Sequence, residues 1–141
     1  MSKQTARYGV EYASTILHIS NIAVHFKSQS FFPSKDINAM FIPKGFYIVF
    51  SIDWLKTAHK LEVLKCAFHE TRHAYQRACI DFPEVMQHDE IEVKVWEKEF
   101  ESYKNPNIDG YLDQHLEKDA IWFSDYLLKE VIECERFQRL F

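Results

Sequence analysis

Residues 66–76, CAFHETRHAYQ, form the stretch that decides how this sequence folds. They lie inside a longer segment, from about Lys56 to Ile80, that contains neither glycine nor proline. Apolar side chains recur along this segment at helical spacing, at Leu61, Leu64, Phe68 and Tyr75. The pattern therefore predicts one long helix, which Asp81-Phe82-Pro83 ends.

The residues before this helix favour short strands. Asn21 to Phe26 alternates apolar and polar residues, which is typical of a strand with one buried face. Ala39 to Ile42 and Phe46 to Ile52 are rich in strand-forming residues and flank the turn Pro43-Lys44-Gly45, so we expect a hairpin. A weaker helical pattern, from about Ala6 to His18, precedes them.

The residues after the long helix favour two more helices. Pro83 can open the first of them, which we expect to run to about Tyr103. Gly110 marks the end of a loop, and the last helix is expected from about Tyr111 to Cys134 or beyond. Strands grouped early and helices grouped late predict an α+β fold, in which a small antiparallel sheet of about three strands packs on helices.

Composition narrows the class of protein. A chain of 141 residues, 47% of them hydrophobic, predicts one globular domain over residues 1–141. The net charge of -4 comes from well-mixed charges, which argues against a nucleic-acid partner. No apolar stretch approaches the ~20 residues of a membrane span. The odd set Cys66, Cys79 and Cys134 indicates free thiols, and with no signal peptide in view we expect a cytoplasmic protein.

The pattern His-Glu-x-x-His at residues 69–73 carries the chemistry. On a helix, His69 and His73 lie on one face one turn apart, where two imidazoles can bind one Zn²⁺ ion. Glu70 lies about 100° further round the helix, beside the ion rather than on it. That is the position of a general base that takes a proton from the attacking water.

Two features keep a plainer interpretation open. A pentapeptide of this kind also arises by chance, and then these side chains belong to an ordinary helix face. Arg72 is charged at an inner position of the motif, where peptidases prefer an uncharged residue. Its guanidinium must either reach solvent or meet a carboxylate.

The segment Glu117-Lys118-Asp119-Ala120-Ile121-Trp122-Phe123 resembles the Glu-x-x-Ala-x-x-Phe signature of compact gluzincins. These are zinc peptidases of the zincin type, and the phage- and mobile-element-associated peptidases that cleave repressors are among them. The resemblance implies a minimal zincin-like fold with the His-Glu-x-x-His helix at its centre. It also implies that Glu117 is the third zinc ligand and that Ala120 lets two helices approach. The chain departs from such relatives at Arg72, where they have glycine.

The residues alone leave the third ligand open. Asp113, Glu117, Ala120 and Ser124 share one helical face, which is consistent with packing near a metal. Rival ligands are Asp113, His115, Asp119, His88 and Glu92. Cys66, three residues before His69, could instead complete a closed structural site. Tyr103, Tyr111 and His115 are candidates to stabilise an oxyanion, and Asp113 and Asp119 to orient the imidazoles.

The function expected from motif and resemblance is zinc-dependent hydrolysis of a peptide bond in a peptide or protein, with Glu70 as general base. An extended peptide could add to the strand Phe46 to Phe50, if that strand lies at the sheet edge. The alternative is a non-catalytic, zinc-stabilised module that binds another protein. A third interpretation is a homodimer through the apolar segment Glu130 to Phe141.

Overall fold

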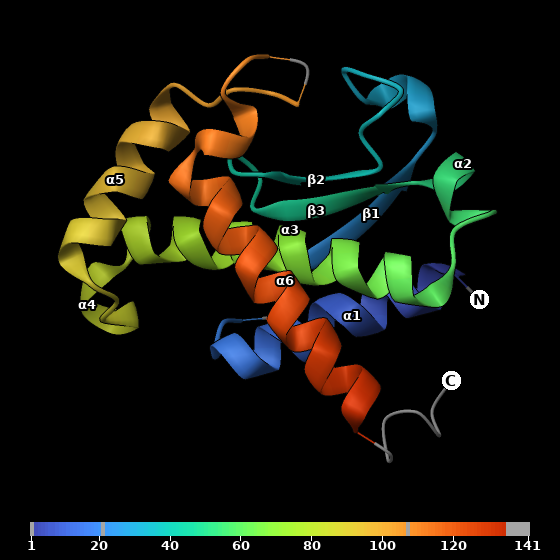
Figure 1. Cartoon of the computed structure of the whole chain (residues 1–141), viewed down its shortest axis with the longest axis horizontal. Coiled ribbons are helices and arrows are strands. Elements are labelled where there is room, and N and C mark those ends of the chain that lie inside the picture. The colour runs from blue at the N-terminus through green and yellow to red at the C-terminus, as the bar shows by residue number, and fades with distance from the viewer. Residues whose placement is uncertain (1, 21, 107, 135–141) are drawn as a thin grey trace.

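The α+β fold is confirmed in a computed structural model that describes residues 2–20, 22–106 and 108–134 (Figure 1). A helix and three strands come first: α1 (Ser2–Leu17), β1 (Ala23–Lys27), β2 (Ala39–Ile42) and β3 (Tyr47–Ser51). Five helices follow: α2 (Ile52–Leu55), α3 (Lys60–Asp81), α4 (Pro83–Met86), α5 (Glu90–Glu101) and α6 (His115–Glu133). Short 3₁₀ turns, η1 (Gln29–Phe31) and η2 (Tyr111–Asp113), lie in two of the connections.

Helix α3 is the central element, as the sequence predicts. The sheet lies on one side of it, α1 lies on the other, and α6 crosses it (Figure 1). A capping box starts α3: the His59 ring accepts from the Leu61 amide, and the Glu62 carboxylate accepts from the His59 amide. Gly9 lets α1 approach closely, because a Cβ there would lie 2.7 Å from the Cβ of Ala67.

The sheet is mixed, so the expectation of a purely antiparallel sheet is corrected. Strands β2 and β3 form the predicted antiparallel hairpin, but β1 pairs in parallel with β3. The strand order is β1-β3-β2, because the chain passes across to β2 before it returns as β3 between its two partners. The nearly continuous apolar run of β3 fits a central strand. Strand β3 therefore has no free edge, which rules out peptide addition to residues 46–50.

Two predicted helices begin or end elsewhere. The helix expected from Pro83 to Tyr103 is interrupted, because Gln87 has a φ of 52° and ends α4 in the left-handed region. Helix α5 starts anew after Asp89, whose carboxylate accepts from the Glu92 amide. The last helix begins at His115 rather than Tyr111, since Tyr111–Asp113 form a 3₁₀ turn and Gln114 is extended.

The core surrounds α3 and the inner face of the sheet. Phe50, Phe68, Ile48, Leu64 and Trp96 are among its largest fully buried side chains. Trp122, by contrast, is 58% exposed, and its ring stacks on Tyr126. Phe137, Leu140 and Phe141, on which the expected dimer face depends, lie outside the described residues. In the described ranges, no helix combines the length and apolar character needed to cross a bilayer.

Candidate metal centre

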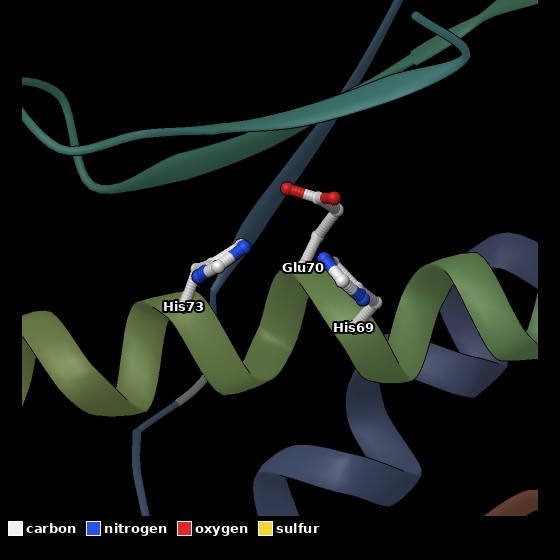
Figure 2. A group of neighbouring side chains, drawn as sticks. All are labelled: His69, Glu70 and His73. Atoms are coloured by element: carbon white, nitrogen blue, oxygen red, sulfur yellow. The ribbon is translucent and has the colours of Figure 1, made fainter. Parts of the chain in front are cut away.

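Helix α3 brings three potential metal-ligating side chains together. Figure 2 shows His69, Glu70 and His73 on the side of α3 that faces the sheet. Each offers a ligand atom within 4.8 Å of those of the other two. The two imidazole rings lie 4.9 Å apart, edge to face. The helical spacing of the motif therefore produces the convergence that the sequence predicts.

Glu117 of α6 reaches both imidazoles. Its Oε1 lies 3.0 Å from His69 Nε2, and its Oε2 lies 2.9 Å from His73 Nε2. The hydroxyls of Tyr103 and Tyr111 donate to the same carboxylate at 2.6 and 2.8 Å. Four partners satisfy a carboxylate that is fully buried, so this one can stay ionised inside the protein.

The pKa of Glu117 follows from these contacts. Burial alone raises it, but the hydrogen bonds and charges of His69 and His73 outweigh burial and hold the pKa well below its usual range. Burial and the Glu117 charge both raise the pKa values of Tyr103 and Tyr111 above their usual range. The two tyrosines therefore remain hydroxyl donors at neutral pH.

Gln76 fixes the orientation of His73. Its Nε2 donates to the Leu116 carbonyl and to Asp119 Oδ2, so its Oε1 faces His73 Nδ1 at 2.8 Å. The second ring nitrogen of His73 faces Glu117, so both nitrogens have acceptors and the ring is an imidazolium. Burial lowers the pKa of His73, but Glu117, Glu70 and Gln76 outweigh it and raise the pKa to about 9. A proton thus occupies the Nε2 atom that a metal would need.

Glu70 contacts the sheet rather than Glu117. Its Oε1 accepts a hydrogen bond of 2.8 Å from the backbone amide of Phe41, on the outer edge of β2. Burial raises the pKa of the Glu70 carboxyl, and the charges of His73 and His69 and the Phe41 amide oppose that rise. A carboxyl whose pKa is raised towards neutrality is better matched to general-base chemistry.

Arg72, the charged residue inside the motif, lies against a carboxylate, which is one of the two environments that the sequence predicts for it. Arg72 binds Asp119 of α6 through Nε at 2.7 Å and Nη2 at 3.0 Å. Its guanidinium also lies over the ring of Tyr75, 4.4 Å from the centroid. Asp119 in turn accepts from Gln76, so Arg72 belongs to the network that supports His73.

We predict that Arg72→Ala lowers the free energy of unfolding by about 3–5 kcal/mol, because Asp119, whose side chain is only 14% exposed, then loses its charge partner. Urea denaturation followed by circular dichroism measures the loss. Lys65→Ala is the matched control, since Lys65 pairs with Asp125 on the surface, where both side chains are about half exposed. Its loss should stay below about 1 kcal/mol. Equal losses in the two variants would contradict a buried, supporting role for Arg72.

The other candidate ligands are occupied elsewhere. His115 pairs with Glu99, and His88 contacts Glu92 and Tyr75. Asp119 pairs with Arg72, and Asp113 is exposed. Cys66 lies outside the group of converging ligand atoms, and burial, with the charges of Glu70 and Glu62, raises the pKa of its thiol to about 12. A thiolate ligand that would close the site is therefore disfavoured.

Sequence reasoning missed two contacts of this centre. Gln76 lies three residues after His73, so the helical spacing places it beside that ring and could have identified it. The Phe41 amide could not have been found in this way, because the pairing of β2 with the rest of the sheet decides that it faces α3. Of the proposed imidazole-orienting carboxylates, Asp119 acts through Gln76.

The donor set fits a zinc ion. Two imidazoles and one carboxylate are the ligand types of catalytic zinc sites, which keep a further position open. The residues that hydrogen-bond these ligands also suit a metal site, since Gln76 orients one imidazole and two tyrosines hold the carboxylate. Glu117 lies directly against both Nε2 atoms, so an ion held by the three residues would replace the contacts that link them now.

No protein-family model, no curated protein and no solved structure matches this chain. What the chain does must therefore be argued from the residues of the centre.

Proposed function

We propose that this protein is a zinc-dependent peptidase. One observation carries the proposal: a fully buried carboxylate from α6, Glu117, contacts both imidazoles of the His-Glu-x-x-His helix, with Glu70 beside them at a sheet edge. The arrangement separates two roles. His69, His73 and Glu117 converge on one point. Glu70 lies next to that point and contacts the edge strand β2.

His69, His73 and Glu117 would hold the ion. A bound Zn²⁺ supplies Lewis-acid activation of water and of the peptide carbonyl. Gln76 keeps the Nε2 atom of His73 directed at Glu117, and Tyr103 and Tyr111 keep the Glu117 carboxylate in place. Holding the ligands rigidly in this way reduces the reorganisation that binding requires.

Glu70 moves the proton. Its carboxylate accepts a proton from the attacking water and then delivers it to the leaving amine nitrogen, so that the peptide bond is replaced by a carboxylate and an amine. The Phe41 amide holds Glu70 Oε1 and leaves Oε2 to take the proton. Tyr103 and Tyr111, whose hydroxyls donate to Glu117, would be the donors available to a developing oxyanion beside the ion.

A substrate peptide would extend along β2, which replaces the earlier expectation that it adds to residues 46–50. Strand β2 is at the sheet edge next to α3, and its Phe41 amide points away from β3. Edge strands bind extended peptides through their backbone groups. The three cysteines are free thiols, which favours the reducing cytoplasm as the compartment for this reaction.

The proposal is tested by the zinc dependence of hydrolysis. Protein stripped with a chelator and then supplied with one equivalent of Zn²⁺ should cleave an unfolded protein such as reduced casein, and the stripped protein should not. Product amines are measured by their reaction with a fluorogenic dye. If zinc binds and no cleavage follows, the non-catalytic zinc-stabilised module is the better account.

A further inference from the structure

A pocket of about 300 Å³ opens beside Glu70 and His73, between β2 and the segment after α5. Its walls are largely apolar. Ile37, Ala39, Phe41 and Pro43 come from β2 and its flanks, and Phe100 and Pro106 from the far side. This volume lies at the lower end of the range for ligand pockets and suits a single large side chain.

Most of the polar side chains at the pocket are already engaged. Tyr103 and Tyr111 donate to Glu117, His73 donates to Glu117 and Gln76, and Glu70 accepts from the Phe41 amide. An acidic side chain entering here would lose its hydration and would meet the Glu70 carboxyl. An apolar side chain would lose no hydrogen bond and would remove the apolar walls from water.

A second hollow, on the His69 side of Glu70, is lined by a mixture of apolar and charged side chains. It is wider, about 480 Å³, and its lining includes Asp36, Asn38, Glu62 and Lys65. Ala39, Glu70 and Tyr111 line both hollows. A peptide lying along β2 would therefore place one side chain in the apolar pocket on the His73 side of Glu70 and another in the wider, mixed hollow on the His69 side.

We infer that the pocket beside His73 selects substrates, taking a large apolar side chain such as Phe, Leu or Met next to the bond that is cut. The inference rests on the proposed function, because the bond to be cut is placed at Glu70. Each methylene in an apolar pocket contributes roughly 10–200-fold to discrimination. Phe in this position should therefore exceed Ala at least about 100-fold in kcat/KM, and Asp should be the poorest.

The experiment uses four matched unstructured peptides that differ at one residue, which is Phe, Leu, Ala or Asp. Cleavage by the zinc-loaded protein gives kcat/KM for each peptide. Fluorescence anisotropy of the same peptides on metal-free Glu70→Gln protein gives binding without any reaction. Ala39→Leu fills the pocket and should reduce the advantage of Phe over Ala at least about tenfold in both assays.

Two further variants keep the test decisive. Asn105→Trp narrows the exposed rim of the pocket should Ala39→Leu fail to fold, and it should also reduce the advantage of Phe. Asn38→Trp is the matched control, because Asn38 lines only the wider hollow, and it should leave the preference between Phe and Ala unchanged.

The outcomes separate the inference from the proposed function. A preference for Phe in binding that the pocket variants reduce supports the inference, even if nothing is cleaved, in which case the proposed hydrolysis fails alone. Cleavage of all four peptides at similar rates would overturn the inference and leave the peptidase standing. The absence of any preference in both assays would overturn it as well.

Discussion

Glu70→Gln is expected to abolish hydrolysis while zinc remains bound, with a loss of about 10²–10⁴-fold in kcat. The amide has nearly the same shape as the carboxylate, and its oxygen can still accept from the Phe41 amide, so the fold should be unchanged. What it cannot do is accept a proton from water. The ligands His69, His73 and Glu117 are untouched, so zinc content should stay at one ion per chain.

The measurement is single-turnover cleavage of a fluorogenic peptide, with zinc content determined on the same sample. Glu130→Gln, the same substitution at an exposed position of α6, serves as the control and should retain full activity. Unchanged turnover in Glu70→Gln would refute the general-base role. Loss of zinc together with activity would instead make Glu70 a ligand, an arrangement that the close grouping of His69, Glu70 and His73 also allows.

Glu117→Gln is expected to weaken zinc binding at least about 10²-fold, more than the loss of a residue that only supports a ligand. An amide lacks the negative charge, and it cannot accept from two imidazoles and two tyrosine hydroxyls at once. The variant should therefore lose the stabilisation by zinc that the wild type gains, about 2.7 kcal/mol at a free zinc concentration 100 times the Kd.

Thermal or urea unfolding with and without zinc measures this gain. Glu99→Gln is the matched control, because the Glu99 carboxylate accepts from the amides of His115 and Leu116 at the start of the same helix. It should lower stability yet keep the full gain from zinc. If Glu117→Gln keeps that gain too, Glu117 is a structural carboxylate and the third ligand lies elsewhere.

Local patterns predicted the elements that depend on local chemistry. The residues of β2 are those expected, and α3 ends at Asp81 beside the predicted stop. Pairing between distant segments was beyond such patterns. Whether β1 runs parallel to β3 depends on how the chain crosses the sheet, and the break at Gln87 depends on a backbone conformation that this residue type rarely adopts.

The same distinction between local patterns and contacts of distant segments holds for the candidate centre. His69, Glu70 and His73 could be placed together because one helix carries them. Glu117 lies 48 residues after His69, and its helical face left it one of several possible ligands until the resemblance favoured it. The structure places its carboxylate against both imidazoles. Trp122 is an exception to the burial that is usual for large aromatic residues, because its ring lies outside Arg72, 5.8 Å from the guanidinium.

The most direct test of the metal centre is the pH dependence of zinc binding. In the metal-free protein His73 has a pKa of about 9, so zinc must displace the proton from its Nε2 atom at neutral pH. Calorimetric titration should give one ion per chain, with an apparent affinity that falls at least about tenfold per unit as the pH drops from 8 to 6, and His73→Ala should not bind. Absence of stoichiometric zinc, or binding that survives His73→Ala with no dependence on pH, would contradict the account.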